Sequence, residues 1–263
     1  MRHTATMKLG ILISMAGLCP YLAAQHEPGA HGVAKHPAEM NKKFADPQMN
    51  IEGFVKRFES GPREVYVRRD EIARAVNLRP SESVADIGAG TGLFVRLFAE
   101  RVGPGGTVYA VDISPAFLRH IERRAKEDGQ DRVVKAVKNT QDSVGLPAGS
   151  IDVAFLCDTY HHFEHPGKML ASIRHALRPG GRLILVDFDL RPDSSKAVKQ
   201  RARAPREVYI REIIAAGFDP IATPRAPSLK EQFFLEFRRA EVDRQGTSGT
   251  APSPRAKTPP VKH

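Results

Sequence analysis

The central part of the chain alternates short β-prone runs with segments whose apolar residues recur at helical spacing. The β-prone run 83–87, for example, is followed by a segment in which Phe94, Leu97 and Phe98 share one helical face. The run 151–157 is apolar at almost every position, as in a strand that is covered on both faces. Strands are predicted at 83–87, 107–111, 133–137, 151–157 and 182–188, and helices at 91–102, 114–125, 169–177 and 207–216, with an apolar run at 233–237 and an amphipathic helical segment around 65–76.

Strands that alternate with helices predict an α/β fold, in which a mostly parallel sheet has helices on both faces. Residues 51–240 make up one doubly wound domain of this kind, and its ligand is expected at the carboxyl ends of the strands. The flanking segments differ in composition. Residues 25–50 contain several Pro, Gly and His and are predicted as a flexible linker, and residues 241–263 are rich in Pro, Ser, Thr and Gly and are predicted as a disordered tail.

The first 24 residues have the three-part layout of a secretory signal peptide. Two cations, Arg2 and Lys8, precede an apolar run over 9–18, and small residues end the segment at Ala24. The run is too short to span about 30 Å of hydrocarbon by itself. We therefore expect cleavage after residue 24 and an exported protein, periplasmic or secreted. If the segment is retained, a cytoplasmic or membrane-associated protein is expected.

The positive charge of the chain is concentrated in one segment. The 263 residues include 40 Lys and Arg against 30 Asp and Glu, and six of these cations lie within residues 191–206. Such a segment suits an anionic acceptor or an anionic membrane surface, or it is a solvated loop. Nucleic acid is disfavoured as a partner, because no aromatic residue is interleaved with these cations. Two cysteines exclude a Cys-based zinc or iron–sulfur site.

The most informative motif is DIGAGTG, from Asp86 to Gly92, at the junction of the first strand and the first helix. Glycines here let the backbone turn sharply and approach a ligand closely. The last glycine stands one place earlier than in a dinucleotide-binding motif, which disfavours that class. Asp112 ends the second strand and Asp142 follows the third, so three acids are in register with three successive strand ends. The alternative is that the acids of the first two strands only cap turns.

Four motifs taken together resemble the class I S-adenosylmethionine-dependent methyltransferases, in their type 11-like form. They are VADIGAGTG at 84–92, VYAVD at 108–112, Leu-Pro at 146–147 and LRPGG at 177–181. The resemblance covers about residues 50–240. It implies a single domain with a mostly parallel, seven-stranded, Rossmann-like sheet, and S-adenosyl-L-methionine as the cofactor.

The resemblance also implies which residues bind the cofactor. The three glycines pass under its methionine and ribose parts, Asp86 helps to hold the methionine amino group, Asp112 binds the ribose, and Asp142 lies by the adenine. The full cofactor-binding set is Asp86, Gly88, Gly90, Gly92, Asp112, Ile113, Asp142, Ser143 and Cys157. Because S-adenosylmethionine is made in the cytosol, this cofactor conflicts with export, and the sequence leaves that conflict open.

The segment after the fourth strand, residues 158–165 (DTYHHFEH), is expected to border both the methyl group and the acceptor. Methyl transfer requires aligned reactants and, for some acceptors, a base. His161 and His162 are the candidate bases and Tyr160 is a candidate wall of the pocket, and these three form the predicted catalytic set. The alternative is that one histidine faces water and the other hydrogen-bonds the loop. A metal site formed with His165 is disfavoured, because a loop without a distant further ligand does not complete one, and no metal is expected.

We predict methyl transfer to a small-molecule acceptor that is anionic or lipophilic. Enzymes that methylate the exocyclic amines of DNA bases resemble one another in a Pro-Pro motif at this strand end, which residues 158–160 lack. Two alternatives stay open: a nucleoside-binding protein on the same fold without catalysis, and a nucleic-acid methyltransferase. The sequence does not specify an oligomeric state.

Overall fold

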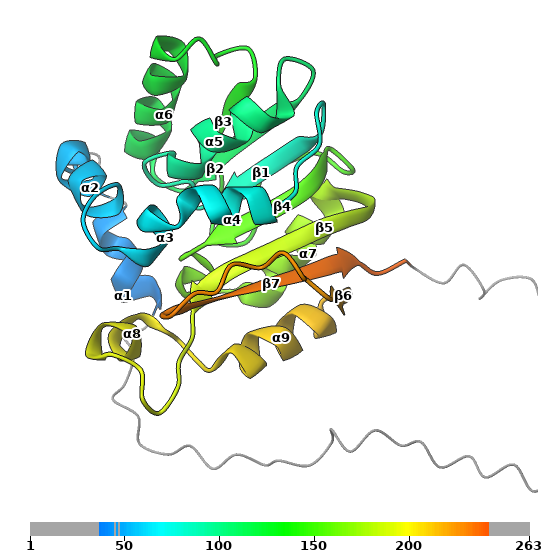
Figure 1. Cartoon of the computed structure of the whole chain (residues 1–263). Coiled ribbons are helices and arrows are strands. Elements are labelled where there is room, and N and C mark those ends of the chain that lie inside the picture. Colours follow the sequence, from blue (N-terminus) through cyan, green and yellow to red (C-terminus); the bar gives the residue numbers. More distant parts are fainter. Residues whose placement is uncertain (1–36, 45, 47, 242–263) are drawn as a thin grey trace, which may run out of the picture. The chain divides into compact units, whose positions relative to one another are not determined.

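The computed structural model describes residues 37–44, 46 and 48–241, and this part forms a seven-stranded sheet with helices on both faces (Figure 1). The strand order is β3-β2-β1-β4-β5-β7-β6. Strands β1 to β5 are parallel, and β7 is antiparallel to β5 and β6, so the predicted mostly parallel α/β fold is confirmed. The strands are β1 (Ser83–Ile87), β2 (Thr107–Asp112), β3 (Val134–Lys138), β4 (Ile151–Cys157), β5 (Leu177–Phe188), β6 (Phe218–Ile221) and β7 (Gln232–Arg239).

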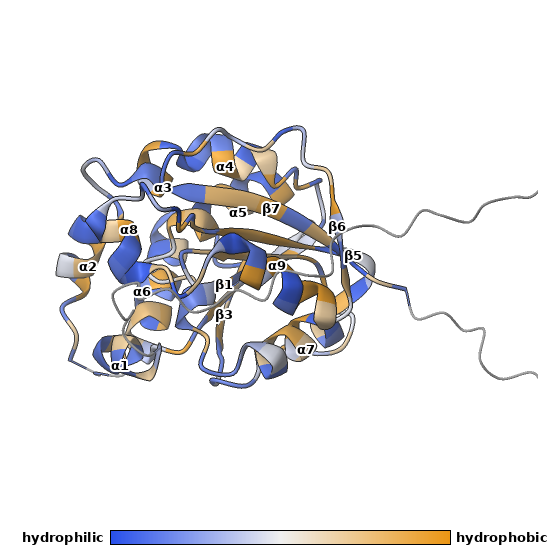
Figure 2. Ribbon diagram, turned by 90° about the horizontal axis from the view of Figure 1, so that it is seen from below, coloured by the Kyte–Doolittle hydropathy of each residue, from blue (hydrophilic) through white to orange (hydrophobic). Residues whose placement is uncertain are grey.

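Adjacent side chains of the central strands point to opposite faces of the sheet, which produces two apolar layers. In β1, Val84 packs in the layer that contains α4, α5 and α6, whereas Ala85 and Ile87 pack in the layer that contains α7 and α9. Figure 2 shows the apolar residues gathered on the strands and on the helix faces that cover them. The helices are α1 (Pro37–Asn41), η1 (Lys42–Phe44), α2 (Ile51–Phe58), α3 (Glu64–Val67), α4 (Arg69–Ala75), α5 (Leu93–Val102), α6 (Pro115–Glu127), η2 (Tyr160–His162), α7 (Pro166–Ala176), α8 (Lys196–Arg201) and α9 (Arg206–Ala215).

A separate aromatic cluster joins the segment before the sheet to α6. The rings of Phe44, Phe54 and Phe58 contact the buried ring of Phe117, with centroids 5.4 to 6.4 Å apart. This differs from the predicted flexible linker over 25–50, because its residues 37–44 form α1 and η1 and pack on the domain. Proline and glycine content predicts a linker, but in the described part of this segment Phe44 and Met49 pack in the cluster around Phe117.

Two further differences concern the strands of the sheet. Strand β6 is absent from the prediction, because its sequence Phe-Asp-Pro-Ile lacks a clear alternation and contains Pro220. It forms because β7 offers it a partner, and as the last strand of the sheet it tolerates a proline. Strand β5 begins at Leu177 rather than at 182, with a register shift against β4 between Ile151 and Val153.

Candidate active site

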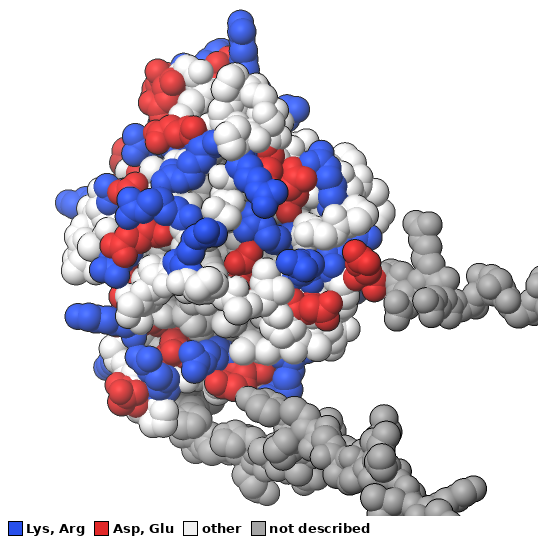
Figure 3. All heavy atoms as spheres, turned by 45° about the vertical axis from the view of Figure 1, so that its right-hand side comes forward, with Lys and Arg blue, Asp and Glu red and all other residues white. Residues whose placement is uncertain are grey.

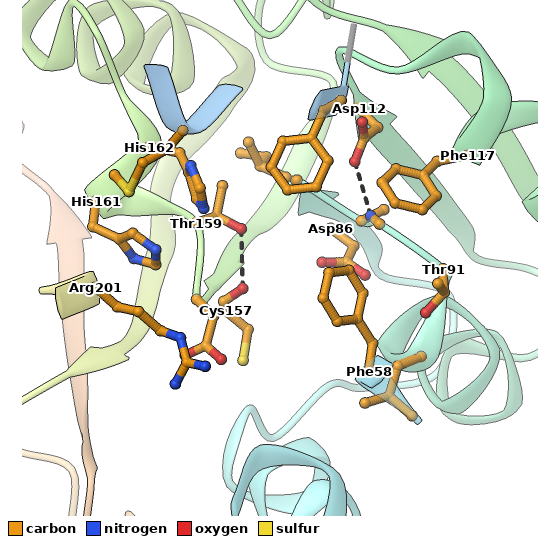
Figure 4. Close-up of a pocket in the computed structure, with 18 of the residues that line it drawn as sticks. Phe58, Asp86, Thr91, Asp112, Phe117, Cys157, Thr159, His161, His162 and Arg201 are labelled. Atoms are coloured by element: carbon orange, nitrogen blue, oxygen red, sulfur yellow. Dashed lines mark hydrogen bonds between the residues drawn. The ribbon is translucent and has the colours of Figure 1, made fainter. Parts of the chain in front are cut away.

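A cavity of about 580 Å³ opens at the carboxyl ends of the parallel strands (Figure 4). Its lining comes from the loop after β1, the ends of β2 and β4, the turn η2 that follows β4, and parts of α1, α2 and α8. This is the edge at which doubly wound sheets bind their ligands. A cavity of this volume suits small molecules, whose sites range over roughly 300–1,000 Å³.

The glycine loop between β1 and α5 forms one wall of the cavity. Gly88, Gly90 and Gly92 have φ angles of 75°, 56° and 83°, in the left-handed region that favours glycine. At Gly88 a Cβ atom would lie 2.3 Å from Cγ2 of Thr159, so this loop packs directly on the segment after β4. At Gly90 a Cβ atom would meet nothing closer than the ring of Phe58, at 3.7 Å, so backbone conformation alone selects glycine there.

Two buried acids lie behind this loop and line the cavity. Burial first, and the nearby Asp112 second, raise the pKa of Asp86 to about 8. Burial raises the pKa of Asp112 to about 6, although its carboxylate accepts hydrogen bonds from the backbone N–H groups of Gly90 and Ser114, each 2.8 Å long. Neither acid forms an ion pair with a described residue. A ligand that brings an ammonium group to Asp86 would supply a positive partner, and the lone pairs left on Asp112 can accept from ligand hydroxyls.

An amide oxygen without a hydrogen-bond partner lines the cavity next to Asp112. Asn139 is the first residue after β3, and its backbone N–H donates to the carbonyl oxygen of Asp112 (3.2 Å). Its side-chain Nδ2 donates to the carbonyl oxygen of Thr140 (2.9 Å), but its buried Oδ1 accepts from none of the described residues. An adenine amine is a donor of the kind that this oxygen needs. The prediction from sequence considers only acids at strand ends and therefore does not select Asn139. A search that also included amide side chains at strand ends would find it.

Asp142 and Ser143, which were predicted in the cofactor set, are not brought into the cavity. The exposed carboxylate of Asp142 bonds to His165 (2.7 Å) and Lys168 (2.9 Å), and these contacts, led by the hydrogen bond from Lys168, lower its pKa. The hydroxyl of Ser143 lies 3.0 Å from that of Ser172 on α7. Both side chains therefore make contacts outside the cavity, and Asn139 lies where an adenine neighbour was expected.

Ile113 and Cys157, the other predicted cofactor residues, do line the cavity. Each of the two residues lies at the carboxyl end of a strand, and residues at the ends of the adjacent strands also line the cavity. Burial raises the pKa of the Cys157 thiol well above its ordinary value, so the side chain stays a neutral thiol. Cys157 therefore acts as part of the wall and is not activated as a nucleophile.

His161 forms a buried pair with an acid that the sequence reasoning missed. Its Nδ1 lies 2.8 Å from Oδ1 of Asp187 near the end of β5, and its backbone N–H donates to Oδ2 of the same carboxylate (3.2 Å). The two side chains are 4% and 0% exposed. Figure 4 shows the His161 ring at the cavity, near Arg201. Because a carboxylate only accepts, it fixes the proton on Nδ1 and leaves Nε2 with its lone pair.

His162 has a different environment, although it is the neighbouring residue and also lines the cavity. Its Nδ1 donates to Oδ1 of Asn41 on α1 (3.0 Å), while Nδ2 of Asn41 donates to the His162 carbonyl and to Glu164, each at 3.0 Å. Burial, followed by the charges of His161 and Lys43, lowers the pKa of His162 to about 2. This imidazole is therefore neutral at physiological pH, and its contacts hold α1 against the loop after β4.

Tyr160, the third predicted catalytic residue, does not line the cavity. Its hydroxyl donates to Oε2 of Glu212 on α9 (2.8 Å), and its ring packs against Phe163 and Tyr209. Burial, followed by the charge of Glu212, raises the pKa of Tyr160. The residue therefore supports the loop from behind.

Asp158, directly after β4, has a φ angle of 49°, which is uncommon for a residue with a side chain. Its carboxylate accepts from Arg63 (2.8 Å) and, more weakly, from Nε2 of Gln232 (3.4 Å). All three residues line the cavity, and they join α3 and β7 to the loop after β4. Such backbone strain is frequent at ligand sites.

Three of the six cations in the basic segment 191–206 form ion pairs. Arg191 pairs with Asp189, Arg203 with Glu212, and Arg206 with Asp189 and Glu207. On the face shown in Figure 3, Lys and Arg side chains lie beside Asp and Glu side chains. Contact of this segment with an anionic membrane surface stays a prediction. In the described part of the chain no helix is long and apolar enough to cross a membrane, and no group of three or more His, Cys, Asp or Glu could hold a metal ion.

The predicted signal peptide, residues 1–24, lies outside the described residues, as does most of the predicted tail over 241–263. Cleavage after residue 24 and export therefore stay predictions.

Residues 85–185 match the model of a family described as a methyltransferase domain. The ubiquinone/menaquinone biosynthesis C-methyltransferase UbiE of Bordetella avium (strain 197N) is 35% identical over 117 residues, which are 44% of this chain and 44% of that protein. The chain therefore spans less than half the length of this curated relative.

Solved structures extend the similarity over most of the described residues. A SAM dependent methyltransferase from Aquifex aeolicus superposes with a TM-score of 0.62 at 18% identity and covers 73% of this chain and 100% of its own. The [4+2]-cyclase SpnF superposes with a TM-score of 0.56 at 17% identity and covers 72% of this chain and 74% of its own. At these identities the likeness shows the fold, and the two described activities differ.

Proposed function

We propose that this chain is a class I S-adenosylmethionine-dependent methyltransferase and that it transfers the methyl group of S-adenosylmethionine to a small-molecule acceptor. The match of residues 85–185 to a methyltransferase domain and the fold shared with a SAM dependent methyltransferase support the proposal. The observation that carries the proposal is one cavity lined by the glycine loop, two buried acids and His161, whose Nδ1 is paired with the buried carboxylate of Asp187 behind it. The fold alone would not carry it, since a cyclase has the same fold.

We propose carbon as the atom that accepts the methyl group. The curated relatives that match residues of this chain are named as C-methyltransferases. A carbon nucleophile forms when a C–H group or a neighbouring hydroxyl loses a proton, which requires a base near the acceptor. A base of that kind, His161, lines the cavity.

The residues of the cavity fit the proposed cofactor. S-adenosylmethionine, when bound, supplies a methyl group on a positively charged sulfur, from which a nucleophile can displace it. Asp86 would hold the ammonium group, Asp112 the ribose hydroxyls and Oδ1 of Asn139 the adenine amine, because all three residues line the cavity and their side-chain oxygens have acceptor capacity to spare. The glycine loop adds close approach of the backbone, since Gly90 presents no side chain.

His161 is the residue that we assign as the base. Its Nδ1–H donates to Asp187, so Nε2 can take a proton from the acceptor. The buried carboxylate then stabilises the imidazolium that forms. His162 and Tyr160 do not share this role, because one is a neutral hydrogen-bonded support and the other lies outside the cavity.

Cofactor binding is tested by calorimetry on the full chain and on Asp112→Ala. We expect the native protein to bind S-adenosylmethionine and the variant to bind it about ten- to hundredfold more weakly, because a charge-assisted hydrogen bond contributes about 1.5–3 kcal/mol. Asp142→Ala is the matched control, since that carboxylate is exposed and outside the cavity. No binding by the native protein, or an equal loss in both variants, would refute the assignment.

Turnover is tested separately, by transfer of a labelled methyl group to a panel of phenols and activated methylene compounds. We expect incorporation at carbon and its loss in His161→Ala. Cofactor binding without incorporation into any acceptor would favour the alternative of a nucleoside-binding protein that has lost catalysis. Incorporation into RNA or DNA instead would favour the nucleic-acid alternative.

A further inference from the structure

Two arginines line the cavity without an acidic partner, and one of them lies beside the proposed base. Arg201, at the end of α8, lies over the ring of Phe188, with its guanidinium carbon 5.7 Å from the ring centroid. The His161 ring lies 5.4 Å from the same phenylalanine ring. Figure 4 shows Arg201 next to His161 at the cavity. A group held by Arg201 would therefore be close to the proposed base.

The second arginine, Arg57, comes from α2. Its guanidinium lies over the rings of Phe54 and Phe58, 4.9 and 5.1 Å from their centroids. Burial, followed by the positive charges of Arg201 and Arg63, lowers the pKa of Arg57, so the three guanidinium groups are close enough to repel one another. The side chains of α2 and α8 thus bring like charges together at one cavity.

Of these three cations, only Arg63 has an ion-pair partner among the described residues. It pairs with Asp158 (2.8 Å), whereas Arg57 and Arg201 are exposed, form no ion pair with any described residue and lie over aromatic rings. Arg201 differs in this respect from its neighbours in the basic segment, since Arg203 and Arg206 both form ion pairs with carboxylates.

The other acids that line the cavity are engaged elsewhere. The carboxylate of Glu64 accepts from the backbone N–H groups of Lys230 and Glu231, and that of Glu231 accepts from the hydroxyl of Ser195. Asp86 and Asp112 lie at the glycine loop. None of these carboxylates is within ion-pair distance of Arg57 or Arg201, so among the described residues the two guanidinium groups have no ion-pair partner, which an anionic ligand would supply.

We propose that Arg57 and Arg201 bind an oxyanion of the acceptor, a carboxylate or phosphate group, and thereby hold its reactive carbon next to His161. The inference rests on the proposed function, because it names the class of acceptor in that reaction. A guanidinium presents paired N–H donors that match a planar oxyanion. The phenylalanine rings that line the same cavity provide apolar surface for the rest of the molecule, so the acceptor is a small amphiphile with an anionic group.

The test measures binding of benzoate and phenyl phosphate as anionic probes and of benzamide as the neutral counterpart. Calorimetry is done on the full chain with and without S-adenosylhomocysteine. We expect at least one anionic probe to bind at least about tenfold more tightly than benzamide, and Arg57→Gln and Arg201→Gln each to weaken that probe about ten- to hundredfold. Which of the two probes binds more tightly distinguishes a carboxylate from a phosphate acceptor.

Matched controls come from the same two helices. Lys56→Gln and Lys196→Gln each remove one exposed positive charge that does not line the cavity, and both should leave probe binding unchanged. Binding of both anionic probes no tighter than that of benzamide, or an equal loss in the lysine variants, would overturn the proposal. Arg201→Lys is the second variant if Arg201→Gln does not fold. It keeps the charge without the paired donors and should still weaken the probe.

Cofactor affinity separates the two proposals. The arginine variants should bind S-adenosylhomocysteine as the native protein does. A loss as large as that for benzoate would overturn the inference, because the arginines would then hold the carboxylate of the cofactor. If the native protein binds the anionic probes but not S-adenosylhomocysteine, the anion site stands and the proposed function fails.

Discussion

Replacing Asp187 by Asn separates the roles of the two neighbouring histidines, because it removes one charge and almost no volume. The buried carboxylate accepts at Oδ1 from Nδ1 of His161 (2.8 Å) and the backbone N–H of Phe188 (2.8 Å), and at Oδ2 from the backbone N–H of His161 (3.2 Å). If the amide oxygen of the new asparagine takes the position of Oδ1, its NH₂ group faces the backbone N–H of His161. The variant keeps the imidazole orientation in that case but has no charge to stabilise an imidazolium.

The size of the effect follows from that lost charge. A hydrogen bond to a charged group contributes about 1.5–3 kcal/mol, and about 1.4 kcal/mol corresponds to a tenfold change in rate. We therefore expect kcat to fall about ten- to hundredfold. The affinity for S-adenosylmethionine should change little, because Asp187 does not line the cavity.

The assay is methyl transfer at saturating cofactor to the best acceptor of the panel, with calorimetry for cofactor affinity and thermal unfolding to confirm the fold. The chain offers a matched control in Asp142→Asn, because Asp142 and His165 form a similar pair (2.7 Å) that is exposed and outside the cavity. An unchanged kcat in Asp187→Asn, or an equal fall in both variants, would show that His161 is not the base.

Four further outcomes follow from the structure. The free energy of unfolding of the ligand-free protein should fall as the pH rises from about 4 to about 8, by up to about 1.4 kcal/mol per pH unit, because the folded protein retains a proton on Asp86 that the unfolded chain has released. Urea titrations of Asp86→Asn should lose this slope between about pH 6 and 8, whereas Asp112, whose pKa is about 6, still contributes below that range. Gly90→Ala should lower stability by about 1–2 kcal/mol in thermal or urea unfolding, because φ there is 56°, and unchanged stability would contradict this. Asn41→Ala should raise KM for the acceptor without changing cofactor affinity, since it releases α1 from the loop after β4; steady-state kinetics in which KM stays constant would argue against that role. N-terminal sequencing of the protein recovered from its host should begin at Gln25, and an intact Met1 would contradict the signal-peptide prediction.

The cofactor end of the site was the part most open to prediction from sequence. Asp86, Asp112 and Ile113 end or follow strands, and all three line the cavity as expected. Asp142 was selected by the same rule, but it lies further along the loop after β3, and its carboxylate bonds to α7 and the segment before it. The rule fails there because the distance from a strand end decides whether a side chain reaches the cavity.

The sequence by itself determined the sheet, its glycine loop and the edge where the ligand site lies. Strand periodicity, helix periodicity and left-handed turns all depend on residues within a few positions of one another, and the topology of a parallel sheet then brings the strand ends together. The tertiary structure alone distinguished Tyr160, His161 and His162. Their partners, Glu212, Asp187 and Asn41, are 52, 26 and 121 positions away in the chain. No local pattern encodes such pairs, because they form only when the sheet has folded and α1, β5 and α9 have packed around the loop after β4.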